Sequence, residues 1–387
     1  MLFEPANLSE QKAKIVVVGV GGGGGNALNR MIEDGMNSVD FIAINTDAQD
    51  LENNNSQLKL QIGKELTKGL GAGANSEIGE LAVKENEEII AKELNKADMV
   101  FITAGMGGGT GTGAAPAIAK IARKTDALTI GIVTKPFAFE GPKRKKRALE
   151  GIKEMKKNCD TLLVIPNEIL LEIASDTTTV MDSFKLADSI LNQATKGISD
   201  LINKPGLINL DFADVKTVMK NMGDAIMGTG VAKGEEKAIL AAQQAINSPL
   251  LQNTSIKGAK GLLVNVSGSQ DMTMKELNSA SSIIYEEAGE EDINIILGCV
   301  IDPDLGDEIR ITVIATGLND NEYPDFYNVE ETEINFREKY SSHSTVIEEE
   351  SFKENLFDKN NIDENTKEDK SNENDSDLDI PTFLRNN

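Results

Sequence analysis

The chain has 387 residues, of which 63 are acidic and 39 basic, and it contains one histidine, two cysteines and no tryptophan. At ~100–200 residues per domain, this length allows two globular domains and additional chain. The single histidine, His343, lies in a polar C-terminal stretch, so the folded part cannot hold a His-based nucleophilic site or a His-ligated zinc. Its chemistry must rest on carboxylates, backbone amides, hydroxyls or a bound ion.

The negative charge is concentrated at the C-terminal end. Residues 319–387 hold 20 acidic and 7 basic side chains, which is −13 of the net charge of −24. The charge of the remaining chain is ordinary and argues against a nucleic-acid interface. A short basic cluster at residues 143–147 is predicted to be a solvated helix face.

Targeting and redox features are those of a cytoplasmic protein. Residues 1–10 lack a basic segment followed by an apolar one, and no apolar run reaches the ~18 residues that a membrane-spanning helix needs. Cys159 and Cys299 lie far apart in apolar surroundings, which predicts two buried thiols and a reducing compartment. We therefore expect a soluble chain with no direct membrane insertion.

The N-terminal half predicts a doubly wound α/β domain at residues 12–179, after an N-terminal arm at residues 1–11. Apolar, β-branched runs predict strands at residues 14–20, 41–44, 99–103, 128–133 and 161–165. Glycine-containing turns or helical patterns follow several of these strands. Apolar strands that alternate with helices are typical of a parallel sheet covered on both faces.

A long helix and a second domain follow. Apolar residues at 3/4 spacing predict one continuous helix at 180–203, which Pro205 and Gly206 end, and we assign a central helix to residues 180–204. An α+β domain is predicted for residues 205–318. Its helices are expected at 214–222, 235–246 and 275–288, and its strands at 261–266, 293–300 and 308–316. We expect a mixed sheet packed against helices on one side.

The last part of the chain has a different composition. Residues 319–376 contain no glycine, many asparagines and an acidic excess, which predicts a disordered acidic linker. Residues 377–387 concentrate apolar side chains in DLDIPTFLR and predict a short partner-binding peptide.

Two glycine-rich turns each join a predicted strand to a predicted helix. The first, GVGGGGGNALNRM from Gly19, satisfies the G-x-G-x-x-G dinucleotide fingerprint, with Asp47 after the second strand. On this turn alone, a nicotinamide-dependent Rossmann dehydrogenase is the alternative function. The second, GMGGGTGTG at residues 105–113, repeats the arrangement. Two such cradles suit a triphosphate, because glycines let the backbone approach phosphates and helix N-termini present free N–H groups.

These motifs carry a resemblance to a known family. GGGTGTG resembles the signature of the tubulin superfamily. Further segments are similar, in chain order, to those of the FtsZ family of bacterial division GTPases: GVGGGGGNA, NTDAQ, KGLGAGAN, TKPFAFEG, NLDFADV and DLDIPTFLR. The resemblance covers roughly residues 12–318 and the terminal peptide. Pro142 and the basic run that follows it depart from the more apolar helix expected there.

The resemblance implies a GTP/GDP site with Mg²⁺. The residues that would contact phosphates and base are Gly22, Gly23, Gly24, Gly25 and Asn26. Those of the phosphate-binding loop would be Gly108, Gly109, Thr110, Gly111 and Thr112, with Ala72 and Gly73 at the γ-phosphate. Glu140 and Arg144 would hold the ribose, and Asn167, Phe184 and Asp188 would frame the guanine. An Asp carboxylate accepts from the guanine N1–H and amine, a donor pair that adenine lacks. By spacing alone, Phe184 would be a core aromatic.

NLDFADV supplies the candidate catalytic residues Asn209, Asp211 and Asp214. By spacing alone, Asp211 or Asp214 is equally well an N-cap of a helix. In the family this loop inserts into the nucleotide site of the next subunit and positions the attacking water. Phosphoryl transfer needs positioning and charge neutralisation more than a nucleophile, which agrees with the missing histidine.

The resemblance therefore implies an assembly-dependent GTPase that polymerises head-to-tail into filaments and forms the division ring at mid-cell beneath the membrane. Its partners would be further copies of itself and membrane-associated adaptor proteins that bind the peptide between Asp377 and Arg385. A nucleotide-binding scaffold without catalysis is a further alternative, which NLDFADV disfavours.

Overall fold

The computed structural model describes residues 13–173, 177–204, 206–208, 210–251, 256–289 and 293–318. The predicted arm at 1–11, the linker at 319–376, the terminal peptide and Asn209 lie outside the described residues. The domain boundaries remain predictions.

Eleven strands of the described part form one sheet, in the order β3-β2-β1-β4-β5-β6-β8-β11-β9-β10-β7. They are β1 (Ile15–Val20), β2 (Asp40–Asn45), β3 (Leu58–Gln61), β4 (Met99–Gly105), β5 (Leu128–Lys135), β6 (Thr161–Pro166), β7 (Gly206–Ile208), β8 (Gly223–Ala232), β9 (Gly261–Gly268), β10 (Asn294–Ile301) and β11 (Ile309–Thr316). The first six strands are all parallel, and β6 joins β8 through a short parallel pairing.

The helices are α1 (Gly21–Glu33), α2 (Ala48–Glu52), α3 (Lys64–Thr67), α4 (Ser76–Glu85), α5 (Glu87–Leu94), α6 (Thr110–Lys124), α7 (Pro142–Asn158), α8 (Asn167–Ile173), α9 (Val180–Asn203), α10 (Phe212–Met219), α11 (Lys237–Ile246) and α12 (Met274–Ala288). Short 3-10 turns lie at Ala138–Glu140, Pro249–Leu251 and Pro303–Leu305. Within the described residues, none of these helices is both long and apolar enough to cross a bilayer.

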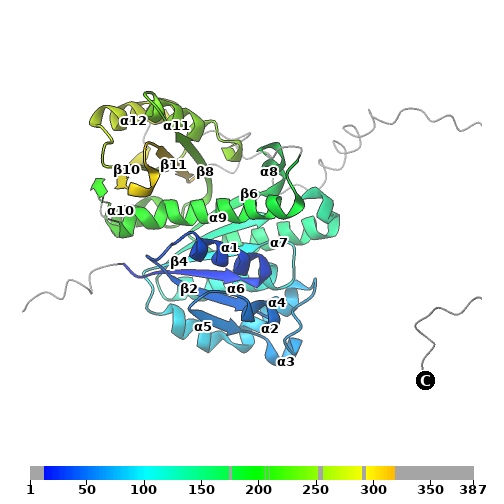
Figure 1. The fold of residues 1–387 in the computed structure, drawn as a ribbon. Helices are drawn as coiled ribbons and strands as arrows, with labels where there is room; N and C mark the ends of the chain where they lie inside the picture. The colour runs from blue at the N-terminus through cyan, green and yellow to red at the C-terminus, as the bar shows by residue number, and fades with distance from the viewer. Residues whose placement is uncertain are drawn as a thin grey trace, which may run out of the picture. The chain divides into compact units, whose positions relative to one another are not determined.

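The parallel part of the sheet is covered on both faces (Figure 1). Ile15 and Val17 of β1 pack with α1 and α9, whereas Val16 and Val18 pack with α4, α5, α6 and α7. Alternate residues of one strand are therefore both buried, which explains the continuous apolar runs in the sequence. The predicted doubly wound fold is confirmed.

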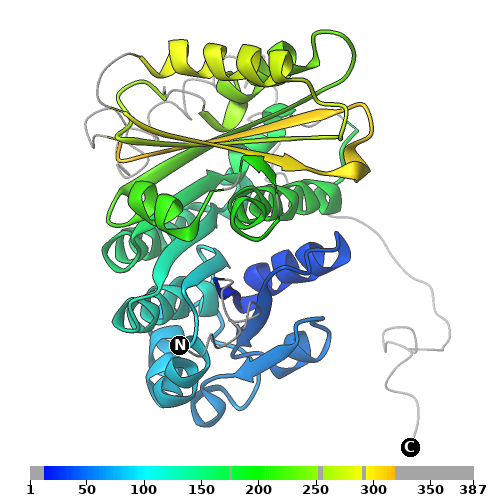
Figure 2. The same ribbon diagram turned by 90° about the vertical axis from the view of Figure 1, so that its left-hand side faces the viewer.

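The remaining strands form the predicted mixed arrangement. β11 pairs antiparallel with β8 and β9, β9 pairs parallel with β10, and β7 closes the edge antiparallel to β10. α11 and α12 cover one face, and α9 and α10 cover the other, where Leu263 and Ile314 join the core around α9 (Figures 1 and 2). The expectation of helices on one side only is thus wrong, because α9 packs against both parts of the sheet.

Three of the described strands, β3, β7 and β8, have no counterpart among the predicted elements, and β8 is the longest of them. The sequence of β8, GDAIMGTGVA, contains three glycines, which weaken a strand signal. The structure explains two of them: Cβ atoms on Gly228 and Gly230 would overlap backbone carbonyl oxygens of Ala245 and Ala241 in α11. The close approach of α11 requires glycine at these positions.

Candidate functional site

The two glycine turns meet at the carboxyl ends of β1 and β4. A Cβ atom on Gly24 would overlap the carbonyl oxygen of Thr103, and one on Gly21 would lie 2.9 Å from the backbone nitrogen of Gly111. β1 lies between β2 and β4, so the direction in which strands are added to the sheet reverses between β1 and β4. Such a switch point is where open α/β sheets bind ligands.

A third glycine-rich stretch, KGLGAGANSEIG at residues 68–79, closes on the second turn. A Cβ atom on Gly109 would overlap the carbonyl oxygen of Gly73 and would lie 3.0 Å from the Cβ of Ala72. The hydroxyls of Thr46 and Thr110 are 2.6 Å apart. The structure therefore brings together the three predicted sets of phosphate-contacting residues: Gly22–Asn26, Ala72 with Gly73, and Gly108–Thr112.

The helices that leave these turns begin without side-chain caps. Within the described residues, the N-cap positions Val20 of α1 and Gly109 of α6 receive no side-chain cap, as is also the case for α3, α5, α7 and α11, whereas α2, α4 and α9 are capped. Uncapped first turns leave backbone N–H groups available and carry a partial positive charge, which favours an anion. Two such helix ends at one switch point suit a polyphosphate.

The buried side chain of Thr112 stabilises the conformation of the second glycine turn. The Thr112 hydroxyl accepts a hydrogen bond of 2.8 Å from the Gly107 N–H. Gly107 has a φ of +105°, which L side chains rarely adopt. The hydroxyl thereby holds the conformation in which this glycine turn presents its N–H groups.

The predicted base-binding residues lie together around the first turns of α9. The ring of Phe184 meets that of Phe137 edge-on at 5.3 Å, and Phe137 stacks on Phe139 at 5.1 Å. Phe184 is 41% exposed, so it is not the core aromatic that its spacing alone suggests. An exposed aromatic face at this place can stack on a planar ring.

Two polar side chains at this end could accept hydrogen bonds from a ligand. Asn167, at the start of α8, is 4% exposed, and its Oδ1 has no hydrogen-bond partner among the described residues. Burial raises the pKa of Asp188 to about 7, and the nearby Arg30 partly opposes that shift. A buried acceptor without a donor is costly, so both oxygens fit a ligand that brings N–H groups.

The predicted ribose-end residues form an ion pair. Arg144 lies 3.0 Å from the Glu140 carboxylate, whose other oxygen accepts a hydrogen bond from the Phe137 N–H at 2.9 Å. Glu168 of α8 accepts from the Ala138 N–H at 2.7 Å. These contacts tie the segment before α7 to α8 and thus to the base-binding end.

Arg147 is a site residue that the sequence analysis missed. It donates to the Gly107 carbonyl at 3.1 Å and to the Ala74 carbonyl at 2.7 Å, so it joins two of the three glycine segments. The prediction of a solvated basic face holds for Lys143 and Lys146, which are exposed, but is wrong for Arg147. The available signal was helical spacing, since residues 144, 147 and 151 share the face of α7 that meets the second turn.

The acidic segment begins α10. The carboxylate of Asp211, the N-cap residue, accepts from the Asp214 N–H at 3.0 Å, and the Asp214 carboxylate accepts from the Asp211 N–H at 3.3 Å. The N-cap interpretation is therefore correct for Asp211. Both side chains are exposed, and each carboxylate keeps a second oxygen outside this capping box.

Within one chain, the acidic segment and the glycine turns lie far apart. Phe184 and Asp188 are in the first turns of α9, and the acidic segment follows its last turn through β7 (Figure 1). At 1.5 Å per residue, a helix of 24 residues is about 36 Å long. The structure does not bring Asp211 and Asp214 to the other predicted site residues of the same chain.

Comparisons with known proteins agree with this arrangement. Residues 14–175 match the GTPase domain of the tubulin/FtsZ family, and residues 223–319 match the C-terminal domain of the FtsZ family. An empty FtsZ dimer structure from M. jannaschii is similar at 46% identity and a TM-score of 0.76, over 80% of this chain and 90% of that one. A mutant of the same FtsZ gives a TM-score of 0.77 at 46% identity, over 80% and 93% of the two chains. CetZ2 from Haloferax volcanii, in a GTPγS-bound protofilament, shares the fold at 20% identity and a TM-score of 0.69, over 84% and 99% of the two chains.

The dehydrogenase alternative rested on the first glycine turn alone and has no support in these matches. High identity to FtsZ over most of both chains, both family domains and a two-turn cradle at the switch point agree with one another. The chain therefore belongs to the FtsZ family of tubulin-like cell-division proteins and is a GTPase.

Proposed function

We propose that this GTPase polymerises head-to-tail and hydrolyses GTP at the junction between two subunits. The observation that carries the proposal is the separation of the glycine turns and the acidic capping box to opposite ends of α9, with both sets accessible. A subunit that stacks on another can place the acidic segment of one over the nucleotide of the next. A head-to-tail contact whose rotation does not close on itself gives a filament.

In this proposal, residues of two subunits form the complete site. Backbone N–H groups of the turns at 21–25 and 108–112, with Ala72 and Gly73, hold the phosphates. Glu140 and Arg144 hold the ribose, while Asn167, Phe184 and Asp188 bind guanine. The carboxylates of Asp211 and Asp214 from the neighbour, with Asn209, orient the attacking water, since phosphoryl transfer depends chiefly on positioning and electrostatics.

We propose that Mg²⁺ binds together with the nucleotide. Among the described residues, no three Asp, Glu, His or Cys side chains are grouped so that they could hold a metal ion. Mg²⁺ in nucleotide sites is commonly held by phosphate oxygens and water with few protein ligands. The ion would neutralise phosphate charge, and the chain would supply the N–H groups around it.

The cellular role follows from the same family membership. We propose that the filaments form the division ring in the cytoplasm at mid-cell and that adaptor proteins at the membrane bind the peptide between Asp377 and Arg385. An FtsZ relative solved as a dimer and the CetZ2 protofilament support self-association.

The test is phosphate release per subunit as a function of protein concentration, at fixed GTP and Mg²⁺, with light scattering recorded in the same cuvette. We expect a specific rate near zero below a threshold concentration and a rise together with scattering above it. A specific rate that is independent of concentration, without scattering, would contradict a shared site. Scattering without phosphate release would instead support the scaffold alternative.

A further inference from the structure

The C-terminal end of α10 is held by two buried hydroxyls. The last carbonyl groups of any helix lack intrahelical partners and usually bind water. Here the Val218 carbonyl accepts from the Thr316 hydroxyl at 2.6 Å, and the Met219 carbonyl accepts from the Thr161 hydroxyl at 2.5 Å. Both threonines are almost fully buried, at 0% and 1% exposure.

The two threonines come from different parts of the sheet. Thr161 is the first residue of β6 in the parallel part, and Thr316 is the last residue of β11 in the mixed part. They are 155 residues apart in sequence and meet successive carbonyls of one helix. The end of α10 is therefore fixed relative to both parts of the sheet at once.

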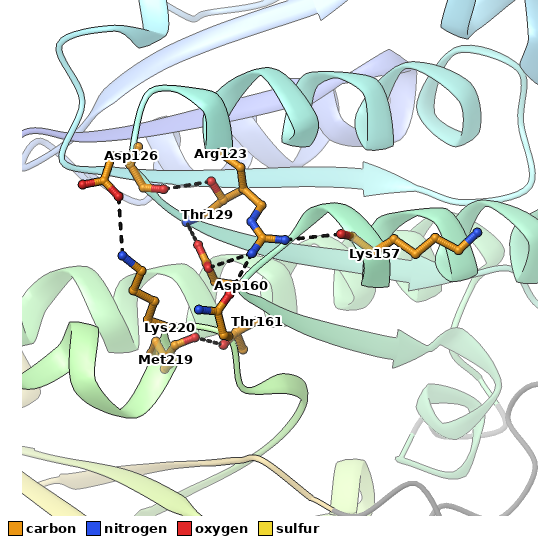
Figure 3. Close-up of polar contacts among 10 residues, drawn as sticks. Arg123, Asp126, Thr129, Lys157, Asp160, Thr161, Met219 and Lys220 are labelled. Carbon is orange, nitrogen blue, oxygen red and sulfur yellow. Dashed lines mark hydrogen bonds and ion pairs between the residues drawn. The ribbon is translucent and has the colours of Figure 1, made fainter.

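A third contact holds the turn that follows α10. Arg123, in the last turn of α6, donates to the Asn221 side chain at 2.7 Å and to the Lys157 carbonyl at 3.3 Å (Figure 3). Its guanidinium also lies 3.7 Å from Asp160, a buried carboxylate that accepts from the Thr129 N–H at 2.9 Å. Asn221 has a φ of +57°, so the chain turns sharply at the residue that Arg123 holds.

A further contact in Figure 3, between Lys220 and Asp126, adds little. Lys220 lies 3.4 Å from Asp126, whose side chain is 84% exposed. Exposed pairs of this kind contribute little to stability or orientation. Thr161, Thr316 and Arg123 therefore supply the polar contacts that hold this end of α10, in addition to the packing of its buried Val215, Val218 and Met219.

We propose that Thr161, Thr316 and Arg123 are positioning residues for GTP hydrolysis in the next subunit. They fix the angle at which α10 presents Asp211 and Asp214, which lie at its opposite, exposed end. An eight-residue helix is about 12 Å long, so a tilt of about 10° at the held end moves the carboxylates by roughly 2 Å. Displacements of this size are large for groups that must orient a water molecule.

This inference rests on the proposed function, in which the acidic segment acts on the nucleotide of the neighbour. Thr161→Val and Thr316→Val each remove one hydroxyl and keep nearly the same volume. We expect the turnover number at saturating GTP to fall about 10-fold in each. GTP affinity below the assembly threshold should stay within about twofold, because the glycine turns are untouched, and so should the scattering threshold with a non-hydrolysable GTP analogue.

Two further variants separate positioning from stability. Thr161→Ser restores the donor but not the methyl group, so turnover should recover although the melting temperature stays below that of the wild type. Asn221→Gly suits the positive φ while it removes the acceptor for Arg123, so turnover should fall in a protein that folds normally. The matched control is Thr195→Val, which removes an equally buried hydroxyl that bonds to the Leu191 carbonyl within α9.

Asp214→Ala, run in parallel, distinguishes failure of the positioning role from failure of the proposed function. If Asp214→Ala loses turnover while both valine variants and Asn221→Gly stay within twofold of the wild type, the positioning role is wrong and the shared site stands. A loss of turnover that follows the loss of melting temperature and that Thr161→Ser does not restore would also overturn it. If Asp214→Ala keeps full turnover, the proposed function fails, and the positioning role fails with it.

Discussion

At the scale of single residues, the predicted base-binding end holds a carboxyl group with a raised pKa and a buried amide oxygen without a donor in the described structure. Asp188 is partly buried at the first turns of α9, and burial raises the pKa of its carboxyl to about 7 despite the nearby Arg30. Asn167 offers a buried oxygen without a donor in the described structure. Guanine would bring N–H donors to both acceptors, so binding would offset the cost of burying these oxygens.

The raised pKa predicts that GTP binding depends on pH. The carboxylate is the form that accepts from guanine, and below pH 7 the free protein holds a proton that binding must release. GTP affinity should therefore be constant above about pH 8 and should fall by about tenfold for each pH unit below 7. The slope is measured by titrating nucleotide-free protein with a fluorescent GTP analogue at pH values between about 5.5 and 8.5. This range brackets the pKa of Asp188.

Two variants test the assignment of the slope to Asp188. Asp188→Asn removes the titrating group and should flatten the profile at a lower affinity. Asp182→Asn is the control on the same helix: a hydrogen bond from Thr179 lowers the pKa of Asp182, so this group does not titrate near neutrality. A slope that survives in Asp188→Asn would assign the proton to another group.

At the scale of elements, α10 has a structural role and, in the proposed function, a chemical role in the same two side chains. The capping box between Asp211 and Asp214 satisfies N–H groups of a short helix that would be marginal in isolation. The same carboxylates carry the negative charge at its exposed tip. A loss of function on mutation could thus come from either role, and the substitutions must separate them.

Asp214→Ala should keep GTP binding and filament formation but lose most hydrolysis. Asp211→Asn keeps an N-cap side chain of equal quality and removes only the charge, so its melting temperature should match that of the wild type while turnover falls. Asp211→Ala should in addition lose about 1 kcal/mol of stability. Phosphate release, sedimentation of filaments and thermal melting measure the three quantities.

Glu287→Ala is the control, since it removes an exposed carboxylate from α12, away from both sets of site residues. Its turnover should equal that of the wild type. Unchanged turnover in Asp214→Ala would remove the acidic segment from the mechanism.

At the scale of the whole molecule, α9 sets the distance between the two halves of the site. Its N-terminal turns carry Phe184 and Asp188, and the chain that leaves its C-terminal end forms β7 and α10. Asp188 and Asn203 lie about 22 Å apart along α9, so Asp211 and Asp214 lie far from the predicted base-binding residues of the same chain. Under the proposed function, hydrolysis therefore requires assembly.

A mixing experiment tests this requirement directly. Asp188→Ala subunits should not bind GTP but keep the acidic segment, while Asp214→Ala subunits bind GTP but lack a complete segment. Each alone should be inactive, whereas random head-to-tail stacking in an equal mixture should restore about a quarter of the wild-type turnover. A mixture as inactive as its components, although both variants are present in sedimented filaments, would contradict a site shared between subunits.

Local sequence patterns were sufficient to predict much of the fold. The parallel strands other than β3, the bounds of α9 at 180–203 and the two strand-to-helix glycine turns are as predicted, because apolar periodicity and glycine runs act over a few residues. The position of the single histidine, beyond the described residues, likewise limited the chemistry on composition alone. The motif NLDFADV identified the acidic segment, and the sequence also allowed an N-cap role for Asp211 or Asp214, which the structure shows for Asp211.

Features that depend on contacts between distant segments could not be predicted in this way. The sequence of β8 does not look like a strand, because its glycines are needed where α11 packs closely on it. Arg147 contacts two glycine segments, because α7 passes beside both of them. The meeting of Thr161 and Thr316 at the end of α10 leaves no trace in either local sequence. Such contacts follow from how the sheet and α9 pack, and packing is a property of the whole chain that no local period records.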